Sequence, residues 1–104
     1  MSRVILARHE NGEQRVTCGW DRPLTTGYVD VYDADGEELA TFGPLSGESL
    51  GAARTAEIAA LHMRRQGLAF TVEDERRLRD LLFRHMGLEY PESNVVEDWT
   101  RDGS

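Results

Sequence analysis

The stretch that decides the fold is GYVDVYDADGEELATFG, residues Gly27–Gly43, which has the pattern of a β-hairpin. Its centre, DADG at residues 33–36, is typical of a type I turn that ends in a left-handed glycine. The flanking segments 28–32 and 38–42 should therefore pair as antiparallel strands. In the first of them, valines alternate with polar or aromatic residues, which indicates a strand buried on one side only.

A second hairpin is indicated nearer the start of the chain, where Asn11-Gly12 lies between the apolar segments 4–7 and 15–18. Asn-Gly is the preferred two-residue type I′ turn, because both central positions need a positive φ. This turn predicts three cross-strand pairs, which are Ile5–Cys18, Ala7–Val16 and Arg8–Arg15. The apolar members of these pairs would form the core face of the hairpin.

From Ser46 onward the apolar residues take a helical spacing, which predicts two helices. Ser46 or Ser49 can cap the first helix, which stops at Gly67. Its apolar residues include Leu50, Ala53, Ile58 and Leu61. A linker at residues 68–70 leads to the second helix, which Thr71 caps and Gly87 ends. The buried stripe of that helix is predicted at Leu78, Leu81, Leu82, His85 and Met86.

The order of these elements predicts an α+β fold. A four-stranded antiparallel meander of two hairpins is followed by two helices packed on one face. We assign residues 1–88 to this single domain and residues 89–104 to an acidic tail. Because Val95, Val96 and Trp99 are poor residues for a free tail, we expect the tail to dock through Trp99, either on its own domain or on a partner.

The length and composition of the chain exclude several classes of protein. The chain has 104 residues with 12 arginines, no lysine, 19 acidic residues and a net charge of −7. This charge argues against nucleic-acid binding, which needs a basic face. No apolar run is long enough to cross a membrane or to serve as a secretory leader. Cys18 is a single cysteine and permits no internal disulfide, so we expect a cytoplasmic protein.

The acidic residues are concentrated in the middle of the chain. Residues 23–53 contain six acids and no basic residue. These acids are Asp30, Asp33, Asp35, Glu37, Glu38 and Glu48. Such a span can mimic a polyanion or dock a basic partner. The simpler interpretation is a solvated surface that promotes solubility.

No residue pattern predicts a catalytic residue, a metal site or a cofactor. The three histidines and Cys18 lack the spacing of metal ligands. Ser49 lies in a Gly-x-Ser-x-Gly pattern, but the hydrolase fold that uses this pattern is too large for the chain, and helix capping explains the serine. Cys18 lies on the expected core face, where a thiol behaves as a small apolar group.

The most unusual segment is the loop Gly19–Gly27, GWDRPLTTG, which joins the two hairpins. Its Trp20 and Arg22 are of the residue types that most often anchor protein interfaces, and Asp21 lies between them. Arg8 and Arg15 would lie on one sheet face, where two opposed arginines need an anion or a carboxylate between them. In the alternative interpretation, Trp20 closes the edge of the core, Asp21 pairs with Arg22, and the other two arginines point to water.

These features predict a non-enzymatic accessory protein of bacterial, phage or plasmid type. It would act by binding another protein, as an inhibitor or regulator, or by forming a homodimer. The contact residues would be Trp20, Asp21, Arg22, Arg8, Arg15 and Trp99. The alternative is a small-ligand or catalytic domain in which Arg8, Arg15 and Arg22 bind a carboxylate or another anion. A ligand site needs a concave pocket, whereas a partner site needs a broad exposed patch.

Overall fold

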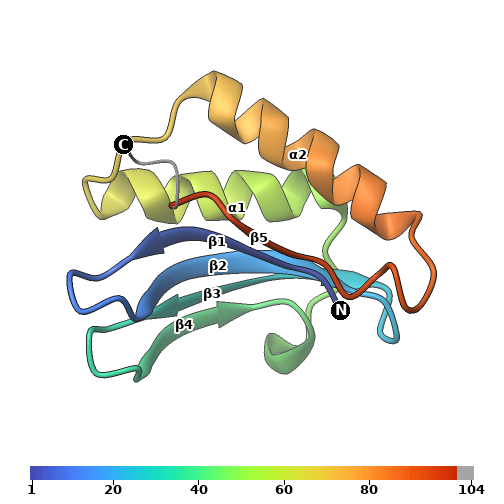
Figure 1. Ribbon diagram of the computed structural model, residues 1–104, viewed down its shortest axis with the longest axis horizontal. Helices are drawn as coiled ribbons and strands as arrows, with labels where there is room; N and C mark the ends of the chain where they lie inside the picture. Colours follow the sequence, from blue (N-terminus) through green and yellow to red (C-terminus); the bar gives the residue numbers. More distant parts are fainter. Residues whose placement is uncertain (101–104) are drawn as a thin grey trace.

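The computed structural model describes residues 1–100, which form a five-stranded sheet with two helices on one face (Figure 1). The strand order is β4-β3-β2-β1-β5, and β1 to β4 pair in antiparallel fashion. The strands are β1 Arg3–Arg8, β2 Gln14–Asp21, β3 Thr26–Tyr32, β4 Glu38–Phe42 and β5 Val96–Asp98. The helices are α1 Ala52–Arg65, α2 Val72–Met86 and the short 3-10 helix η1 Pro44–Ser46. The predicted α+β class, the antiparallel meander and the two helices are confirmed.

The hairpin of β3 and β4 forms as its sequence predicts. Gly36 has a φ of 85°, and its amide donates to the carbonyl oxygen of Asp33 at 3.1 Å. The side chain of Asp33 also stabilises the turn, because its Oδ1 accepts from the amides of Asp35 and Glu37 at 2.9 Å each. On β3 the two valines are buried as predicted, with Val29 in the core under the helices. Tyr28 is buried too, at 7% exposure, so the prediction that only one side of this strand is buried is wrong at that residue.

The hairpin of β1 and β2 forms, but its predicted register is wrong except for Ala7 opposite Val16. The observed pairs are Val4–Cys18, Ile5–Thr17, Ala7–Val16 and Arg8–Gln14. The turn is not type I′, because Gly12 has a positive φ of 88° and Asn11 does not. The loop is also longer than two residues, since the amide of His9 donates to the carbonyl oxygen of Glu13 at 2.8 Å.

The wider loop explains this error, because three of the four observed pairs are centred on Asn11 instead of between Asn11 and Gly12. Ala7 keeps its predicted partner because of two register shifts in β1. They lie between Ile5 and Ala7 and between Ala7 and Arg8, so strict alternation fails across these residues. Val4 and Leu6 consequently belong to the core under the helices, whereas Ile5 is buried outside that cluster. A register shift of this kind cannot be counted from the tip of a hairpin, because it displaces one strand without altering the pattern of residue types.

Helix α1 begins later than expected. Its N-cap is Gly51, without a side-chain cap, so the predicted capping by Ser46 or Ser49 is wrong. Of the apolar residues named for this helix, Ile58 is buried, whereas Ala53 and Leu61 are exposed. The buried residues are Ala52, Thr55, Ala56, Ile58, Ala59, Ala60 and Met63. Because most of these side chains are small, this face lets the helix lie close to the sheet, which Leu61 would prevent.

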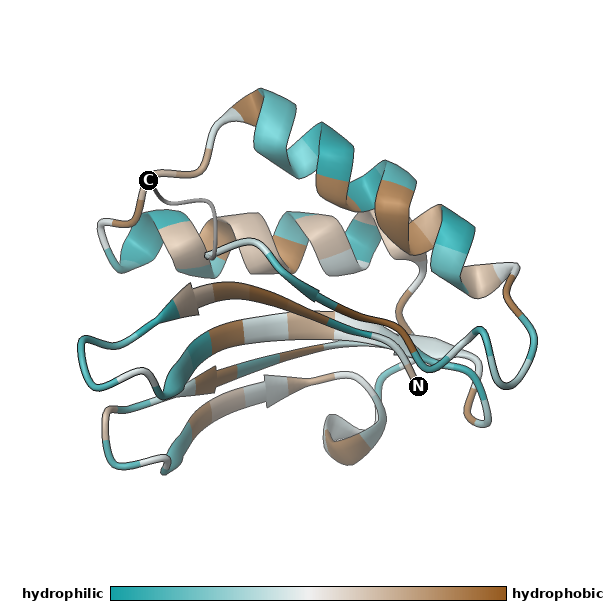
Figure 2. Ribbon diagram, in the orientation of Figure 1, coloured by the Kyte–Doolittle hydropathy of each residue, from teal (hydrophilic) through white to brown (hydrophobic). Residues whose placement is uncertain are grey.

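Helix α2 has the ends and the buried stripe that its sequence predicts. The amide of Asp74 donates to the Thr71 hydroxyl at 3.0 Å, and the amide of Thr71 donates to the Asp74 carboxylate at 2.9 Å. Buried residues on the helix are Leu78, Leu81, Leu82 and His85, and Gly87 is the C-cap. Figure 2 shows hydrophilic residues over much of the outer surface of α2 and hydrophobic ones along β1. Within residues 1–100, no helix combines the length and apolarity that a membrane span needs.

The segment after α2 returns to the sheet, which the sequence did not predict. β5 pairs in parallel with β1, with Val96 opposite Arg3. Trp99 follows directly; its amide donates to the carbonyl oxygen of Ile5 at 2.9 Å, and its partly buried ring packs against the core. The segment assigned to a tail thus contributes the fifth strand. Residues 101–104 of that segment lie outside the described part of the chain.

Candidate functional site

The three arginines that we expected at a binding site have separate protein partners. Arg8 pairs with Asp98 on β5 at 2.8 Å. The Nε of Arg15 donates to the side-chain oxygen of Gln66, after α1, at 2.6 Å. Arg22 contacts the segment after α2, where its Nη2 lies 2.6 Å from the Glu89 carboxylate and its Nη1 donates to the Met86 carbonyl oxygen at 2.9 Å. The structure therefore does not gather these arginines around one anion.

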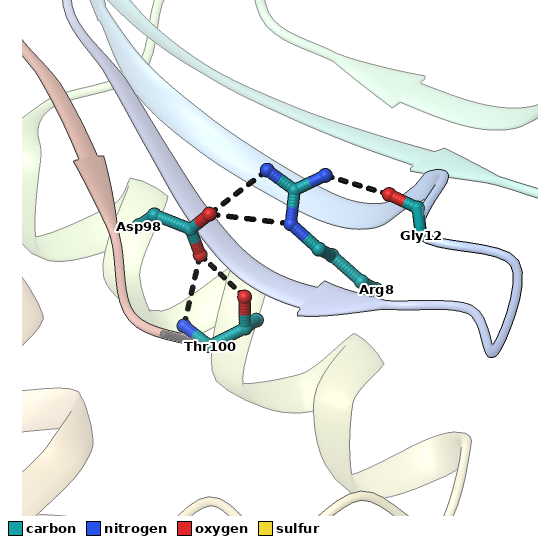
Figure 3. A network of polar contacts seen from close by, with 4 residues as sticks. All are labelled: Arg8, Gly12, Asp98 and Thr100. Carbon is teal, nitrogen blue, oxygen red and sulfur yellow. Dashed lines mark hydrogen bonds and ion pairs between the residues drawn. The ribbon is translucent and has the colours of Figure 1, made fainter. Parts of the chain in front are cut away.

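The contacts of Arg8 form a polar network that joins β5 to the end of β1 (Figure 3). Its Nε and Nη2 donate to Oδ2 of Asp98 at 3.2 and 2.8 Å, and its Nη1 donates to the Gly12 carbonyl oxygen at 2.6 Å. Oδ1 of Asp98 accepts from the amide and hydroxyl of Thr100. The Thr100 hydroxyl, together with Arg8, holds the pKa of Asp98 below its ordinary value. We infer that this network has a structural role, since it holds β5 and the residue that follows Trp99 against the end of β1; we call it the Arg8–Asp98 latch.

The expected opposition of Arg8 and Arg15 is wrong. The register places Gln14 opposite Arg8, for the reason given above for β1. The guanidinium groups bind to different elements, since Asp98 belongs to β5 and Gln66 follows α1. No anion is needed to separate two facing cations at this place in the hairpin.

The predicted loop Gly19–Gly27 is wrong in its bounds, because β2 runs to Asp21 and β3 begins at Thr26, so only residues 22–25 connect the two strands. This segment exposes residues other than its tryptophan. Trp20 is 4% exposed, and its amide donates to the Ser2 hydroxyl at 2.9 Å, which agrees with the interpretation of a core-edge side chain. Asp21 is also buried and uses Oδ1 to accept from the amide of Leu24 at 3.2 Å. The exposed tip consists of Pro23, Leu24 and Thr25. Sequence reasoning missed Leu24, although an apolar residue at the tip of a polar loop is itself a signal.

Around this tip, several apolar side chains from distant parts of the chain come together. One hollow of about 210 Å³ is lined by Met1, Leu24 and Leu45 among others, and a second of about 280 Å³ is lined by Met1, Pro23 and Tyr90. We call these five residues the loop-end surface. Leu24 is 61% exposed, Leu45 81% and Tyr90 78%. The surface lies at the end of the sheet where Figure 1 marks the N-terminus.

The two hydroxyl groups that line the first hollow, those of Tyr28 and Thr41, have partners within the chain. The Tyr28 hydroxyl donates to the Ser2 carbonyl oxygen at 2.6 Å, and burial raises its pKa above the ordinary value. The Thr41 hydroxyl donates to Oδ1 of Asp30 at 2.7 Å. Within residues 1–100, no group of three or more His, Cys, Asp or Glu side chains is arranged to hold a metal ion. The chemistry of this hollow suits an apolar contact better than a reaction.

Trp99 follows β5 directly and lines a larger hollow of about 520 Å³, together with residues of β1, α1, α2 and β5. Its ring stacks on Phe70 with the centroids 6.4 Å apart, and the guanidinium carbon of Arg77 lies 4.6 Å from its centroid. Trp99 therefore packs within its own domain. It does not join Trp20, Asp21 or Arg22 in one surface.

Between α2 and β5 the structure buries one incompletely bonded histidine. His85 is 3% exposed; its Nε2 lies 3.7 Å from Glu97, and its Nδ1 has no hydrogen-bond partner. Burial lowers the pKa of His85, and the neighbouring Glu97 opposes that shift only in part. A neutral ring in this position contributes packing between helix and strand.

Comparison of the chain with protein-family models, with curated proteins and with solved structures finds no match in any of the three. Of the six expected site residues, Asp21 and Arg22 line the two hollows of the loop-end surface. Trp20 is buried beside them, and Arg8, Arg15 and Trp99 lie elsewhere.

Proposed function

We propose that this chain is a small, non-enzymatic interaction protein that binds another protein through the loop-end surface. Such a protein acts as a regulator or inhibitor of its partner, because it contributes bound surface and no chemistry. A free cysteine and the absence of disulfides favour the cytoplasm as the place of this interaction.

The exposure of large apolar side chains on the loop-end surface carries the proposal. Leu24, Leu45 and Tyr90 are each more than half exposed, and Met1 connects the two hollows between them. A partner that covers these side chains removes apolar area from water, which is the main favourable term in protein association. Apolar side chains that gather on the surface of a monomer are therefore typical of interaction sites.

The arrangement of the arginines favours protein binding over the alternative of small-anion binding. A site for a carboxylate or phosphate needs cationic donors that converge on one point. Arg8, Arg15 and Arg22 instead bind Asp98, Gln66 and Glu89, which lie on different elements. Each would have to leave its present partner before it could bind an anion.

A quantitative affinity purification from the cells that express the protein tests this proposal. The comparison uses the unmodified chain, Leu24→Asp and the matched control Val72→Asp. Val72 is 81% exposed at the start of α2 and is not part of the loop-end surface. A stoichiometric partner should be recovered with the unmodified chain and with Val72→Asp. Its recovery with Leu24→Asp should fall about tenfold or more, as expected of an interface anchor.

Two outcomes would contradict the proposal. One is a partner whose recovery is the same with all three proteins, because the contact would then lie elsewhere. The other is a chain that remains monomeric and retains no protein in stoichiometric amount. A homodimer that Leu24→Asp dissociates in sedimentation would support the surface and identify the partner as a second copy.

A further inference from the structure

The strand β4 leaves one long edge of the sheet without a neighbour. Among the strands of residues 1–100, β4 pairs with β3 alone, and Figure 1 shows it as the outermost strand on its side of the sheet. An edge strand presents a row of backbone N–H and C=O groups that are not bonded within the sheet. β4 contains no proline, and Leu39 on it is 64% exposed. This edge therefore offers both backbone donors and acceptors and an apolar side chain.

The charge beside this edge is acidic and has no cationic partner. The six acids of residues 23–53 lie on β3, in the β3–β4 turn, at the start of β4 and after η1. Within residues 1–100, every ion pair uses a carboxylate from residue 57 or later. Glu37 and Glu38, at the start of the edge, are both exposed. Carboxylates without an ion pair, those of Glu37 and Glu38 among them, thus lie beside the edge whose backbone groups are free.

We propose that β4 accepts an extended, basic segment of the partner protein as a sixth strand of the sheet. The backbone of this segment supplies the hydrogen bonds that the edge lacks, and its lysine or arginine side chains face the acids. The inference rests on the proposed function, since it specifies how a partner protein is held. A second copy of this chain fits less well, because its own β4, ELATF, carries no lysine or arginine that could face these acids.

The side chains on the two faces of β4 are the ones that an added segment would lie beside. The Thr41 hydroxyl donates to Asp30 at 2.7 Å on the face without helices. A register shift between Val31 and Tyr32 leaves Leu39 without a paired residue on β3. Phe42 lies on the other face, where its ring is 4.9 Å from that of His62 on α1. After β4, η1 carries Leu45 of the loop-end surface. An added strand and the loop-end surface would therefore form one continuous contact.

A library of short random peptides displayed on phage, selected against the full chain, tests the inference. Selected peptides are then compared on the unmodified chain, on Glu38→Lys and on the matched control Glu92→Lys. Glu92 is exposed, has no ion-pair partner within residues 1–100 and lies far from β4 in the chain, so the control makes the same charge change. Hydrogen exchange with the bound peptide locates the contact.

The expected result has three parts. The selected peptides should alternate lysine or arginine with β-branched or aromatic residues. They should bind Glu38→Lys about fivefold more weakly than Glu92→Lys, as for the loss of one exposed charge pair. They should also slow the exchange of amides within Glu38–Phe42.

The inference is overturned if the peptides are acidic, if both lysine variants bind them equally, or if protection lies outside β4. Failure to select any peptide overturns it as well. Peptides that require Leu24 but tolerate Glu38→Lys would overturn strand addition while supporting the loop-end surface. A β4-mediated dimer of the chain itself would replace the basic segment by a second copy.

Discussion

Replacement of Gly27 by alanine should destabilise the fold, because α1 meets β3 at this residue. A Cβ atom on Gly27 would lie 1.8 Å from Oγ1 of Thr55 and 2.9 Å from its Cβ. Thr55 is fully buried, and its hydroxyl donates to the Gly51 carbonyl oxygen at 2.7 Å. The amide of Gly27 in turn donates to the Leu50 carbonyl oxygen at 2.8 Å. The strand and the start of the helix are therefore held together on both sides of the clash.

The expected cost is about 3 kcal/mol, the upper part of the usual range for an overpacked core. Rotation of Thr55 away from the new methyl group would give up its hydrogen bond, worth about 1 kcal/mol. Translation of the helix would open gaps in the dense packing on the same face. For a domain of this size, 1 kcal/mol corresponds to about 4–8 °C, so Gly27→Ala should lower the Tm by roughly 12–24 °C.

Urea unfolding of four proteins measures the effect as a double-mutant cycle. These are the unmodified chain, Gly27→Ala, Thr55→Ala and the double variant. Because Thr55→Ala removes the oxygen and the methyl group that clash, Gly27→Ala should cost only about 1 kcal/mol in that background. The coupling free energy is then about 2 kcal/mol.

Gly87→Ala is the matched control for the same chemical change. Gly87 has a φ of −86°, and the nearest atom to an added Cβ is the Arg84 carbonyl oxygen at 3.6 Å. Alanine should therefore be neutral there or stabilise by up to about 1 kcal/mol. Equal costs of Gly27→Ala with and without the Thr55 side chain would refute the reasoning.

Three further predictions follow from the buried and networked groups. Burial lowers the pKa of His85 below its ordinary 6.5. As the pH falls, His85 is therefore protonated in the unfolded chain at a higher pH than in the folded chain. The free energy of unfolding should consequently fall as the pH drops below 6.5. His85→Leu should remove the part of this pH dependence that is due to His85 and leave the part due to His62, whose pKa is also lowered. If urea titrations at several pH values gave the same dependence of the unfolding free energy on pH for both proteins, the role given to His85 would be contradicted. Asp98→Asn weakens the bonds to Arg8, so amide exchange should speed up in β5 more than in β2; uniform changes would argue against a local latch. Burial raises the pKa of the Cys18 thiol, so thiol reagents should modify it only at the rate of global unfolding, and fast modification of the folded chain would show access that the structure does not provide.

At the candidate site, the sequence selected the right segment but the wrong side chain. A nine-residue segment with Trp20, Arg22 and a proline stands out from composition alone. Whether Trp20 or Leu24 faces the solvent depends on where β2 ends and on the bond from the Trp20 amide to Ser2. That bond joins β2 to Ser2, which precedes β1 and lies 18 residues earlier in the chain, so residue type in the segment 19–27 could not reveal it. Met1, Leu45 and Tyr90 joined the surface only through the fold.

The sequence by itself determined the elements whose conformation depends on residues a few positions apart. The turn at Gly36 needs a glycine with positive φ, and the start of α2 needs the reciprocal bonds of Thr71 and Asp74. The apolar spacing of α2 likewise selects its buried face. These features are encoded within a single turn or helix, so they are visible before any tertiary contact is known.

Only the tertiary structure decided the register of β1, the buried face of α1 and the return of β5 to the sheet. β5 has three residues and pairs with a strand more than 90 residues earlier in the chain, so local propensity carries no signal for it. The face of α1 follows from its close approach to Gly27, which excludes Leu61 from the interface. In each case the stabilising free energy comes from packing and backbone pairing between segments that are distant in the sequence. Local patterns of residue types contain no information about such contacts.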